Sequence, residues 1–489
     1  MHQSFAILLL ENVSQLIINE YSMRLVREEQ DIMNKHAYGG SSQVVATTYP
    51  KVIMPENFPP MELCCLTLED INAKQLWEGY KSLPNLRMIK LKNLKNLMKT
   101  PDFKGLLNLE IFMVYEALSL KEIHPSFAHL EKLVYVTIEG CYTLDMVPPI
   151  KSSKQLETLS LSGCNILPQN MNIGPCLEIW FFSGCLRKLD LSLCSLEDGD
   201  IISTDIWDIP NLQVLDLEEN NFSRLNFGLF RLPRLKWLNV SCCEELVELS
   251  GLPSSISVVI ADYCSSLESF GDISNCKWLW KVSLLGDNQL GPLGGDILLK
   301  AMLQGNAKDY FISIKILGID IWRGRSGVWV DWLEPYNMPL PHDWYNDFSG
   351  ILMFVRSRDL DPEINISMKR VLDKDFQSLH LKVSNETGIE TCYHDTIYLG
   401  YFSFRSLRHT GCLNSTYNII SFSLGDEGLY GDWYAFRAVL VPKDDVMQTR
   451  KDPTDCSGFW DEEFNYGKTF TLQHDSNSSI EIVWKPVSW

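Results

Sequence analysis

One apolar pattern, L-x-x-L-x-L, recurs along the first half of the chain. Its first residue falls at Leu63, Leu86, Leu109, Leu133, Leu156, Leu186, Leu212, Leu235, Ile256 and Leu279, at intervals of 21 to 30 residues. A unit of this length cannot bury its apolar side alone, so neighbouring units must stack into a solenoid with one continuous core. Each triplet therefore predicts a short strand whose Leu residues point inward.

The position three residues after each triplet is the second constraint. It holds Cys141, Cys164, Cys194, Asn220, Cys243 and Cys264, although the first units place Leu94 and Ala117 there. Asn or Cys at this position is typical of leucine-rich repeats, because the chain turns inward and needs a compact side chain that can meet buried backbone groups. We therefore predict an α/β leucine-rich-repeat solenoid, with these cysteines buried and reduced rather than catalytic or metal-binding.

The x positions of L-x-x-L-x-L are expected to face outward on the concave side of the sheet, which solenoids use to bind partners. The candidate protein-binding face comprises Tyr135, Lys188, Asp190, Asp216, Trp237 and Asn239. A solvated sheet face without a partner is the alternative. Trp237 favours binding, because aromatic residues are enriched at interface hot spots. We expect all six side chains to be exposed and free of packing roles.

A chain of 489 residues is too long to fold around a single hydrophobic core, so several domains are expected. Residues 1–45 lack a clear period and are interpreted as an unassigned, partly helical leader, and the repeats occupy 46–290. Residues 291–309 form a linker with a short helix at 296–304. The remainder, 310–489, contains alternating segments separated by polar turns: YFISIKILGI, GILMFVRS, SLHLKVSN, TIYLGYFSF, NIISFSLG, YAFRAVLVP and SIEIVWK. Strands at this density predict an all-β sandwich or jelly-roll-like domain.

The motifs of common enzymes are missing from the sequence. It contains no G-x-x-x-x-G-K-[ST], G-x-S-x-G, H-E-x-x-H or G-x-G-x-x-G. Paired Cys and His at 392–395 and 408–412 could form a metal or thiol site, but isolated His residues beside turns are more often structural. The acids Asp461 and Glu463 could share one strand face as a hydrolytic pair, and a solvated turn is the simpler interpretation. We expect no enzyme, catalytic residue, cofactor or metal.

The net charge of −19 bears on possible partners. An acidic surface repels phosphate backbones and anionic lipid, so we expect neither nucleic acid nor a membrane as partner. The apolar run at residues 5–10 is too short for a signal core or a membrane span. These features predict a cytoplasmic or nuclear protein. Sequons such as Asn239-Val-Ser241 point instead toward secretion.

Several segments carry a family resemblance. Residues 75–110, QLWEGYKSLPNLRMIKLKNLKNLMKTPDFKGLLNLE, resemble the first repeats of plant TIR-type nucleotide-binding (TIR-NB-LRR) disease resistance proteins, which typically read LWEG, a Leu triplet and NL-x-K-T-PDF. Residues 120–144 and 251–269 continue this resemblance. Farther along, LPHDWYNDFSGILMFV at 340–355 looks like the core of the family's post-repeat domain, called C-JID, and the segments at 396–404 and 437–446 look like its later strands.

The resemblance implies the sensor half of an immune receptor, which recognises a protein: a pathogen effector or a full-length immune receptor. The family's TIR and NB-ARC segments are not found, so its NAD-cleaving and ATP-binding roles are not carried over. The expected chain is a truncated paralogue, a gene fragment or a partner-dependent sensor. The region at 316–332 also departs from the usual opening of the post-repeat domain.

Two other functions stay open at this point. One is a secreted, inhibitor-like leucine-rich-repeat scaffold, which a glycan on Asn239 would favour. The other is a carbohydrate-binding β-sandwich that uses the repeats as a handle.

Overall fold

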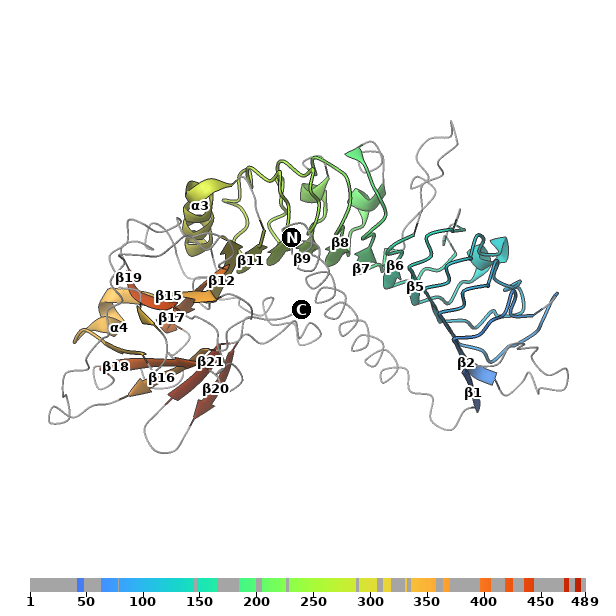
Figure 1. The fold of residues 1–489 in the computed structure, drawn as a ribbon, viewed down its shortest axis with the longest axis horizontal. Coiled ribbons are helices and arrows are strands. Elements are labelled where there is room, and N and C mark those ends of the chain that lie inside the picture. Colours follow the sequence, from blue (N-terminus) through green and yellow to red (C-terminus); the bar gives the residue numbers. More distant parts are fainter. Residues whose placement is uncertain are drawn as a thin grey trace, which may run out of the picture.

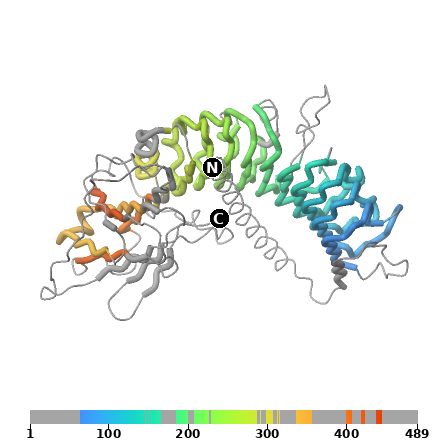
Figure 2. The backbone as a smooth tube through the Cα atoms, in the orientation of Figure 1, coloured from blue at the N-terminus to red at the C-terminus, as the bar shows by residue number. Residues whose placement is uncertain are grey.

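The computed structural model shows the repeats as an arc whose inner side is lined by strands (Figure 1). It describes residues 42–47, 63–77, 79–144, 147–148, 150, 152–164, 184–198, 205–225, 228–286, 290–305, 311–317, 330–331, 336–357, 364–369, 396–405, 418–424, 435–443, 470–474 and 480–484. The coloured backbone tube in Figure 2 runs from the blue first repeats to the orange and red segments between residues 336 and 443, at the other end of the molecule.

The ten apolar triplets each give one strand of a parallel sheet, as predicted. These strands are β2 (Leu63–Glu69), β3 (Met88–Lys92), β4 (Ile111–Tyr115), β5 (Tyr135–Glu139), β6 (Thr158–Ser160), β7 (Lys188–Asp190), β8 (Val214–Asp216), β9 (Trp237–Asn239), β10 (Val258–Ile260) and β11 (Lys281–Leu284). The middle residue of each triplet pairs with its counterpart in the next, as Leu215 does with Leu238. The triplet residues are buried, and a shift of the strand register by one residue would expose them, so the buried core specifies this register.

One parallel strand precedes the triplets and was not predicted. The strand β1 (Ser42–Thr47) pairs with β2 although it lacks the L-x-x-L-x-L pattern. Most of residues 1–45, expected to be a partly helical leader, lie outside the described residues.

The described convex side contains less helix than the α/β expectation implied. It carries the 3-10 helices η1 (Pro125–His129), η3 (Asp205–Asp208) and η4 (Leu229–Arg231). Units of mostly 21–26 residues leave little chain for the return leg, so it stays largely extended. The helix expected at 296–304 is present as α3 (Gly291–Gln304), and it begins earlier than predicted.

The residues three positions after the triplets are buried, and the cysteines among them have free thiols, as predicted. Five of these residues hydrogen-bond to the preceding repeat. The donors and acceptors are Cys164 to Ile138 O (3.1 Å), Cys194 to Leu161 O (3.3 Å), Asn220 to Leu191 O (2.9 Å), Cys243 to Leu217 O (3.3 Å) and Cys264 to Val240 O (3.1 Å). Every acceptor is the carbonyl of the last triplet residue of the previous unit. We call these five donors the ladder residues.

Burial keeps the ladder cysteines in the protonated form that can donate. It raises the pKa of the Cys194 and Cys264 thiols to about 12. A thiol with so high a pKa is a weak nucleophile at neutral pH, which supports a structural role.

The residue before each of these positions adopts a left-handed backbone. Positive φ occurs at Glu116 (54°), Glu219 (54°), Cys242 (56°) and Tyr263 (59°), and at glycines such as Gly163 (63°). Non-glycine residues pay roughly 1–2 kcal/mol for this conformation, so the turn is imposed by the repeat rather than by local preference. The turn leaves the side chains of Glu116, Glu219 and Tyr263 exposed.

The repeat sheet does not stop at the last triplet. The strand β12 (Phe311–Leu317) pairs parallel with β11, so that Ile314 faces Val282 and extends the row of middle triplet residues. On its other side, β12 pairs antiparallel with β17 (Thr396–Ser403), where Ile314 faces Leu399. The sheet continues through β15 (Phe348–Ser357), β19 (Ala435–Pro442) and β13 (Val330–Asp331), giving 16 described strands.

A second sheet of five described strands lies in the same part of the chain. Its order is β14 (Tyr336–Pro339), β18 (Ile419–Leu424), β16 (Ile364–Lys369), β21 (Ile480–Trp484) and β20 (Phe470–His474). A short helix, α4 (Trp344–Asp347), precedes β15, and its buried Trp344 packs on Phe404 with ring centroids 4.5 Å apart. Of the segments expected to be strands, SLHLKVSN lies outside the described residues, while β13, β14, β16 and β20 were not predicted.

We predict that Asn220→Ala destabilises the protein by about 2–4 kcal/mol, because it removes the partners of several buried backbone groups. Asn220 donates to Leu191 O and Leu217 O, and its Oδ1 accepts from the Leu196 N–H, each at 2.9 Å. The free energy of unfolding in urea measures the loss. Asn220→Cys is the matched control, since cysteine fills this position in neighbouring repeats and keeps one donor. A cysteine variant as unstable as the alanine variant would contradict the assigned role of the donor.

Candidate protein-binding face

The six predicted face residues lie on three parts of the parallel sheet. Tyr135 begins β5, and Lys188 and Asp190 are on β7, while Asp216, Trp237 and Asn239 belong to β8 and β9. The structure brings three of them together, because Asp190, Asp216 and Asn239 are in register on adjacent strands. Tyr135 is separated from this group by β6.

The expectation that these side chains are exposed is wrong for five of the six. The exposed fractions are 7% for Tyr135, 4% for Asp190, 1% for Asp216, 3% for Trp237 and 6% for Asn239, and only Lys188 is half-buried. Adjacent strands are about 4.8 Å apart, so side chains in one register row cover each other's flanks. The sequence pattern identifies the face of the sheet but not this lateral packing.

Apolar rows fill two stretches of the face. Trp237 lies between Val214 and Val258 in the register, and all three belong to the main core cluster. Tyr135 packs in a separate cluster with Met88, Ile111, Met113 and Tyr115.

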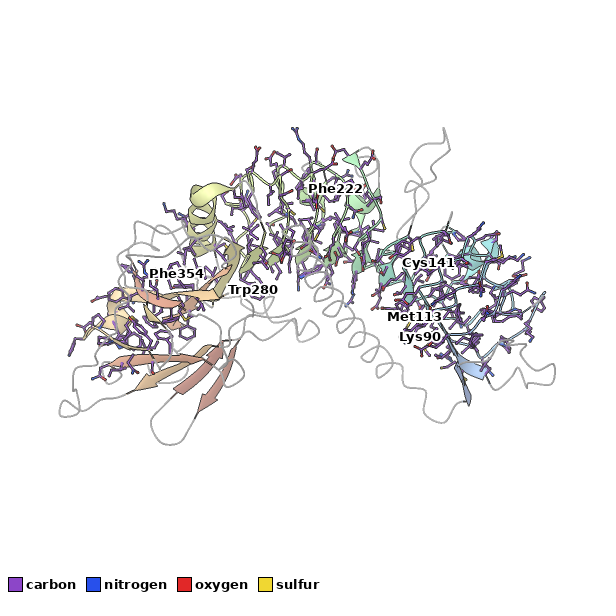
Figure 3. The ribbon with its side chains drawn as sticks, in the orientation of Figure 1. Lys90, Met113, Cys141, Phe222, Trp280 and Phe354 are labelled. Atoms are coloured by element: carbon purple, nitrogen blue, oxygen red, sulfur yellow. The ribbon has the colours of Figure 1, made fainter. Side chains whose placement is uncertain are left out.

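A cation lies beside the second of these apolar stretches. The Lys90 ammonium is 5.9 Å from the centroid of the Tyr115 ring. Lys90 and Met113 are labelled on the first strands in Figure 3.

Polar side chains of the face are bound to each other across strands. Asn239 donates to Asp216 Oδ1 and Glu218 Oε2, both at 3.0 Å, and Ser160 donates to Glu139 Oε1 at 3.0 Å and Asp190 Oδ2 at 3.2 Å. The side chain of Asn239, the asparagine of the sequon, is therefore buried, and its amide is hydrogen-bonded to two carboxylates. The folded structure thus offers no accessible glycan site at Asn239 that would favour a secreted scaffold.

The first x position is an accessible part of the face in the units from Leu86 to Leu235, whereas Trp280 at this position in the last unit is buried. Its side chains are half-buried at Glu110, Glu157, Arg187, Gln213 and Lys236, while Arg87 is exposed. This position precedes the strand pairing of most units, so neighbours cover it less. Sequence reasoning gave the three x positions equal weight and therefore chose the more buried ones. It also overlooked Glu139 and Glu218, which continue the outward alternation beyond the triplet.

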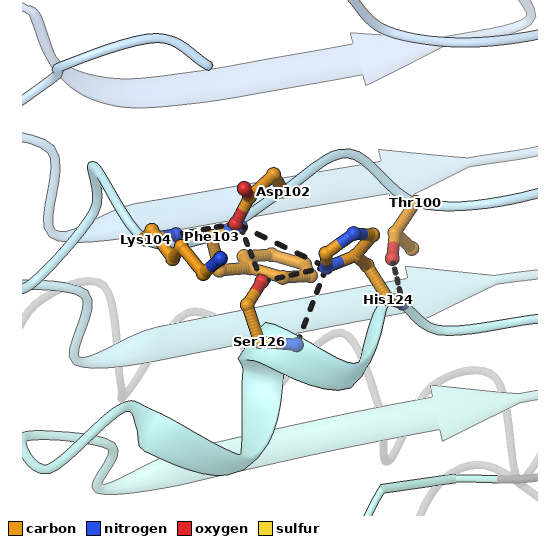
Figure 4. Close-up of polar contacts among 6 residues, drawn as sticks. All are labelled: Thr100, Asp102, Phe103, Lys104, His124 and Ser126. Carbon is orange, nitrogen blue, oxygen red and sulfur yellow. Dashed lines mark hydrogen bonds and ion pairs between the residues drawn. The ribbon is translucent and has the colours of Figure 1, made fainter. Parts of the chain in front are cut away.

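A Ser–His–Asp cluster on the return legs was not predicted (Figure 4). Ser126 Oγ lies 2.7 Å from His124 Nδ1, and Asp102 Oδ1 lies 3.9 Å from that same nitrogen. A catalytic triad needs the carboxylate on the other ring nitrogen. Ser126 is also buried, and its Oγ accepts the Phe103 N–H at 2.8 Å.

The side chains of this cluster accept hydrogen bonds from nearby backbone N–H groups, as capping residues do. The Ser126 N–H donates to His124 Nδ1 at 3.2 Å, so the imidazole caps helix η1. The Lys104 N–H, 2.9 Å from Asp102 Oδ1, lowers the pKa of that carboxyl. The cluster therefore joins two repeats and does not form a nucleophile.

The other sequence candidates lie outside the described residues: the Cys and His pairs at 392–395 and 408–412, and the acids Asp461 and Glu463. Within the described ranges, no group of three or more His, Cys, Asp or Glu side chains is placed to hold a metal ion. Among those same residues, no helix has the length and apolar character to cross a bilayer.

Comparison with known proteins identifies the relatives of this chain. TMV resistance protein N of Nicotiana glutinosa is 30% identical over 209 residues, which is 42% of this chain and 17% of that protein. Disease resistance protein RPS6 of Arabidopsis thaliana is 31% identical over 239 residues, 46% of this chain and 21% of that protein. The homologues of this chain are plant disease resistance proteins.

The match to these resistance proteins is partial. Disease resistance protein RRS1 of Arabidopsis thaliana is 27% identical over 271 residues, half of this chain and 20% of that protein. The aligned part spans about a fifth of the length of these relatives. No protein-family model matches the chain. The solved leucine-rich repeat domain of the type III effector XCV3220 (XopL) is 19% identical to this chain. The match covers 47% of this chain and 70% of the solved chain, with a TM-score of only 0.31.

We predict that Trp237→Ala lowers the free energy of unfolding by about 3–5 kcal/mol, because it empties a packed site between Val214 and Val258. Lys188→Ala on the same face should stay within ~0.5 kcal/mol of the parent, because this side chain is half-buried. Thermal melts of the two variants measure the difference. Equal melting temperatures would contradict the packing described for the face.

Proposed function

We propose that this chain is a non-enzymatic protein-recognition module equivalent to the effector-sensing part of a plant intracellular immune receptor. The observation that carries the proposal is its homology to plant disease resistance proteins at about 30% identity over more than 200 residues. The repeat sheet supports it, since curved solenoids present a long concave surface for protein partners.

The proposed domains are the leader at 1–45, the repeats at 46–290, the linker at 291–309 and a C-JID-like β-sandwich at 310–489. Two sheets in the last region support the sandwich assignment. Because β12 pairs with β11 on one side and with β17 on the other, the repeat sheet continues into the described strands of this last region.

The proposed binding surface is the concave face that includes Tyr135, Lys188, Asp190, Asp216, Trp237 and Asn239. Since five of these are buried, we assign them to the floor of the face. The direct contacts then fall to Lys188 and to the half-buried first x positions, among them Glu157, Arg187, Gln213 and Lys236. Mixed charge along this row suits selective recognition of a protein surface.

The proposed partner is a pathogen effector or a full-length immune receptor, and the proposed location is the cytoplasm, extending to the nucleus. A net charge of −19 supports a protein partner over nucleic acid or an anionic membrane. We further propose that the chain binds no cofactor or metal.

The test is co-precipitation from leaf cells in which the chain is expressed with pathogen effectors, one at a time. We expect at least one effector to bind, and the double variant Arg187→Glu with Lys236→Glu to lose it, because both side chains are half-buried on the proposed contact row. The control Phe230→Ser changes a 61% exposed side chain on helix η4 and should bind normally.

Proximity labelling in the same cells extends the test to endogenous receptors. An effector or receptor that binds the double variant as well as the parent would contradict the concave assignment. If neither assay finds a protein partner, the proposed function is wrong.

A further inference from the structure

A second surface lies at the edge of the sheet where the strands end and the left-handed turns begin. Carboxyl ends of parallel strands share one edge, so the turns after β4 to β10 form a continuous border. We call this border the turn edge. Large apolar side chains are exposed on it, at Leu118 (44%), Tyr142 (62%), Leu193 (39%) and Tyr263 (40%).

Three of these side chains follow one another along the border. The Thr143 hydroxyl donates to Leu118 O at 2.9 Å, which sets Tyr142 beside the turn that carries Leu118. The Tyr142 ring lies over Gly163, where an added Cβ would come within 3.3 Å of Tyr142 Cε1. The Gly163 N–H in turn donates to Ser192 O, next to Leu193. Exposed apolar residues gathered in this way indicate an interaction site.

Negative charge dominates the rest of the turn edge. The turns after β7 to β10, residues 191–198, 217–225, 240–250 and 261–270, contain nine Asp and Glu residues and a single cation, Arg224. Burial and the Glu244 carboxylate raise the pKa of Glu219. Burial and the carboxylates of Glu218 and Glu219 raise the pKa of the Cys242 thiol to about 12. Among these groups, Glu219 and Glu244 are the two carboxylates that repel each other.

We propose that the turn edge binds a cationic protein segment that carries an apolar or aromatic side chain. The apolar side chain packs against Tyr142 and its neighbours, and the Lys or Arg residues lie along the acidic turns. Five strand spacings separate β5 from β10, a distance of roughly 24 Å. An extended segment of about eight residues covers that distance. The turn edge is separate from the strand positions proposed above, so binding at the two surfaces can fail independently.

The experiment selects binders from random peptides of about twelve residues, an extended span of ~40 Å, displayed on phage and enriched on the immobilised full chain. Synthetic versions of the enriched peptides are then titrated by fluorescence anisotropy. We expect them to be rich in Lys or Arg with at least one large apolar residue. Their affinity should fall as salt rises from about 0.05 to about 0.5 M, because ions screen exposed charges.

Matched variants locate the binding. Tyr142→Ser should weaken binding by about tenfold or more, as loss of an interface anchor does. Glu219→Lys with Glu244→Lys should weaken it and flatten the salt dependence. Phe230→Ser and Leu107→Ser remove side chains of similar exposure (61% and 63%) from outside the turn edge and should leave binding unchanged.

Thermal melts check that each variant is folded, and Leu193→Ser replaces Tyr142→Ser if the latter is not. Enriched peptides without a basic excess would overturn the proposal. Equal binding by the folded turn-edge variants, or no enrichment above a resin control, would overturn it as well.

Discussion

The bond from each ladder residue to the preceding repeat is the interaction on which the rest of the structure depends. It ties the end of one strand to the last triplet carbonyl of the strand before, as Cys243 does to Leu217. The donor is buried, so its removal would leave a buried carbonyl without a hydrogen-bond partner, from either protein or water. Repeated from Cys164 to Cys264, this bond fixes the turns that follow β6 to β10.

Both candidate surfaces follow from this geometry. Regular strand spacing presses the x side chains of neighbouring repeats together, which buries Trp237 and Asn239 and leaves the first x positions accessible. The left-handed turn before each ladder position leaves side chains such as Glu219 and Tyr263 exposed on the turn edge. The same repeat therefore produces a packed concave floor and an accessible border.

The sequence predicted the strands and the ladder because both depend on local spacing, as at Leu235, Leu238 and Cys243. It could not predict the burial of Trp237, which depends on Val214 and Val258 in other repeats. It missed β1 because Ser42–Thr47 lacks the triplet and is ordered by pairing with β2. The resemblance to plant resistance proteins was recognisable from the residues at 75–110, and the homologues confirm it.

The pairing of β12 with β11 and β17 could not be predicted from the sequence for a related reason. Phe311–Leu317 was identified as a strand, but its neighbours were not, because Val282 and Leu399 are distant in the chain. Pairing on both edges makes β12 part of one sheet that spans the repeats and the later strands. That continuity places β17, β15, β19 and β13 in the same sheet as the strands of the concave face.

Native-state hydrogen exchange tests this continuity most directly, since it reports which strands open together. If one sheet runs through the junction, amides of β12 and β17 should be as protected as those of β9 to β11. They should also lose protection together with those strands as denaturant is added. Exchange of β12 and β17 under conditions in which β9 to β11 remain protected would contradict the account.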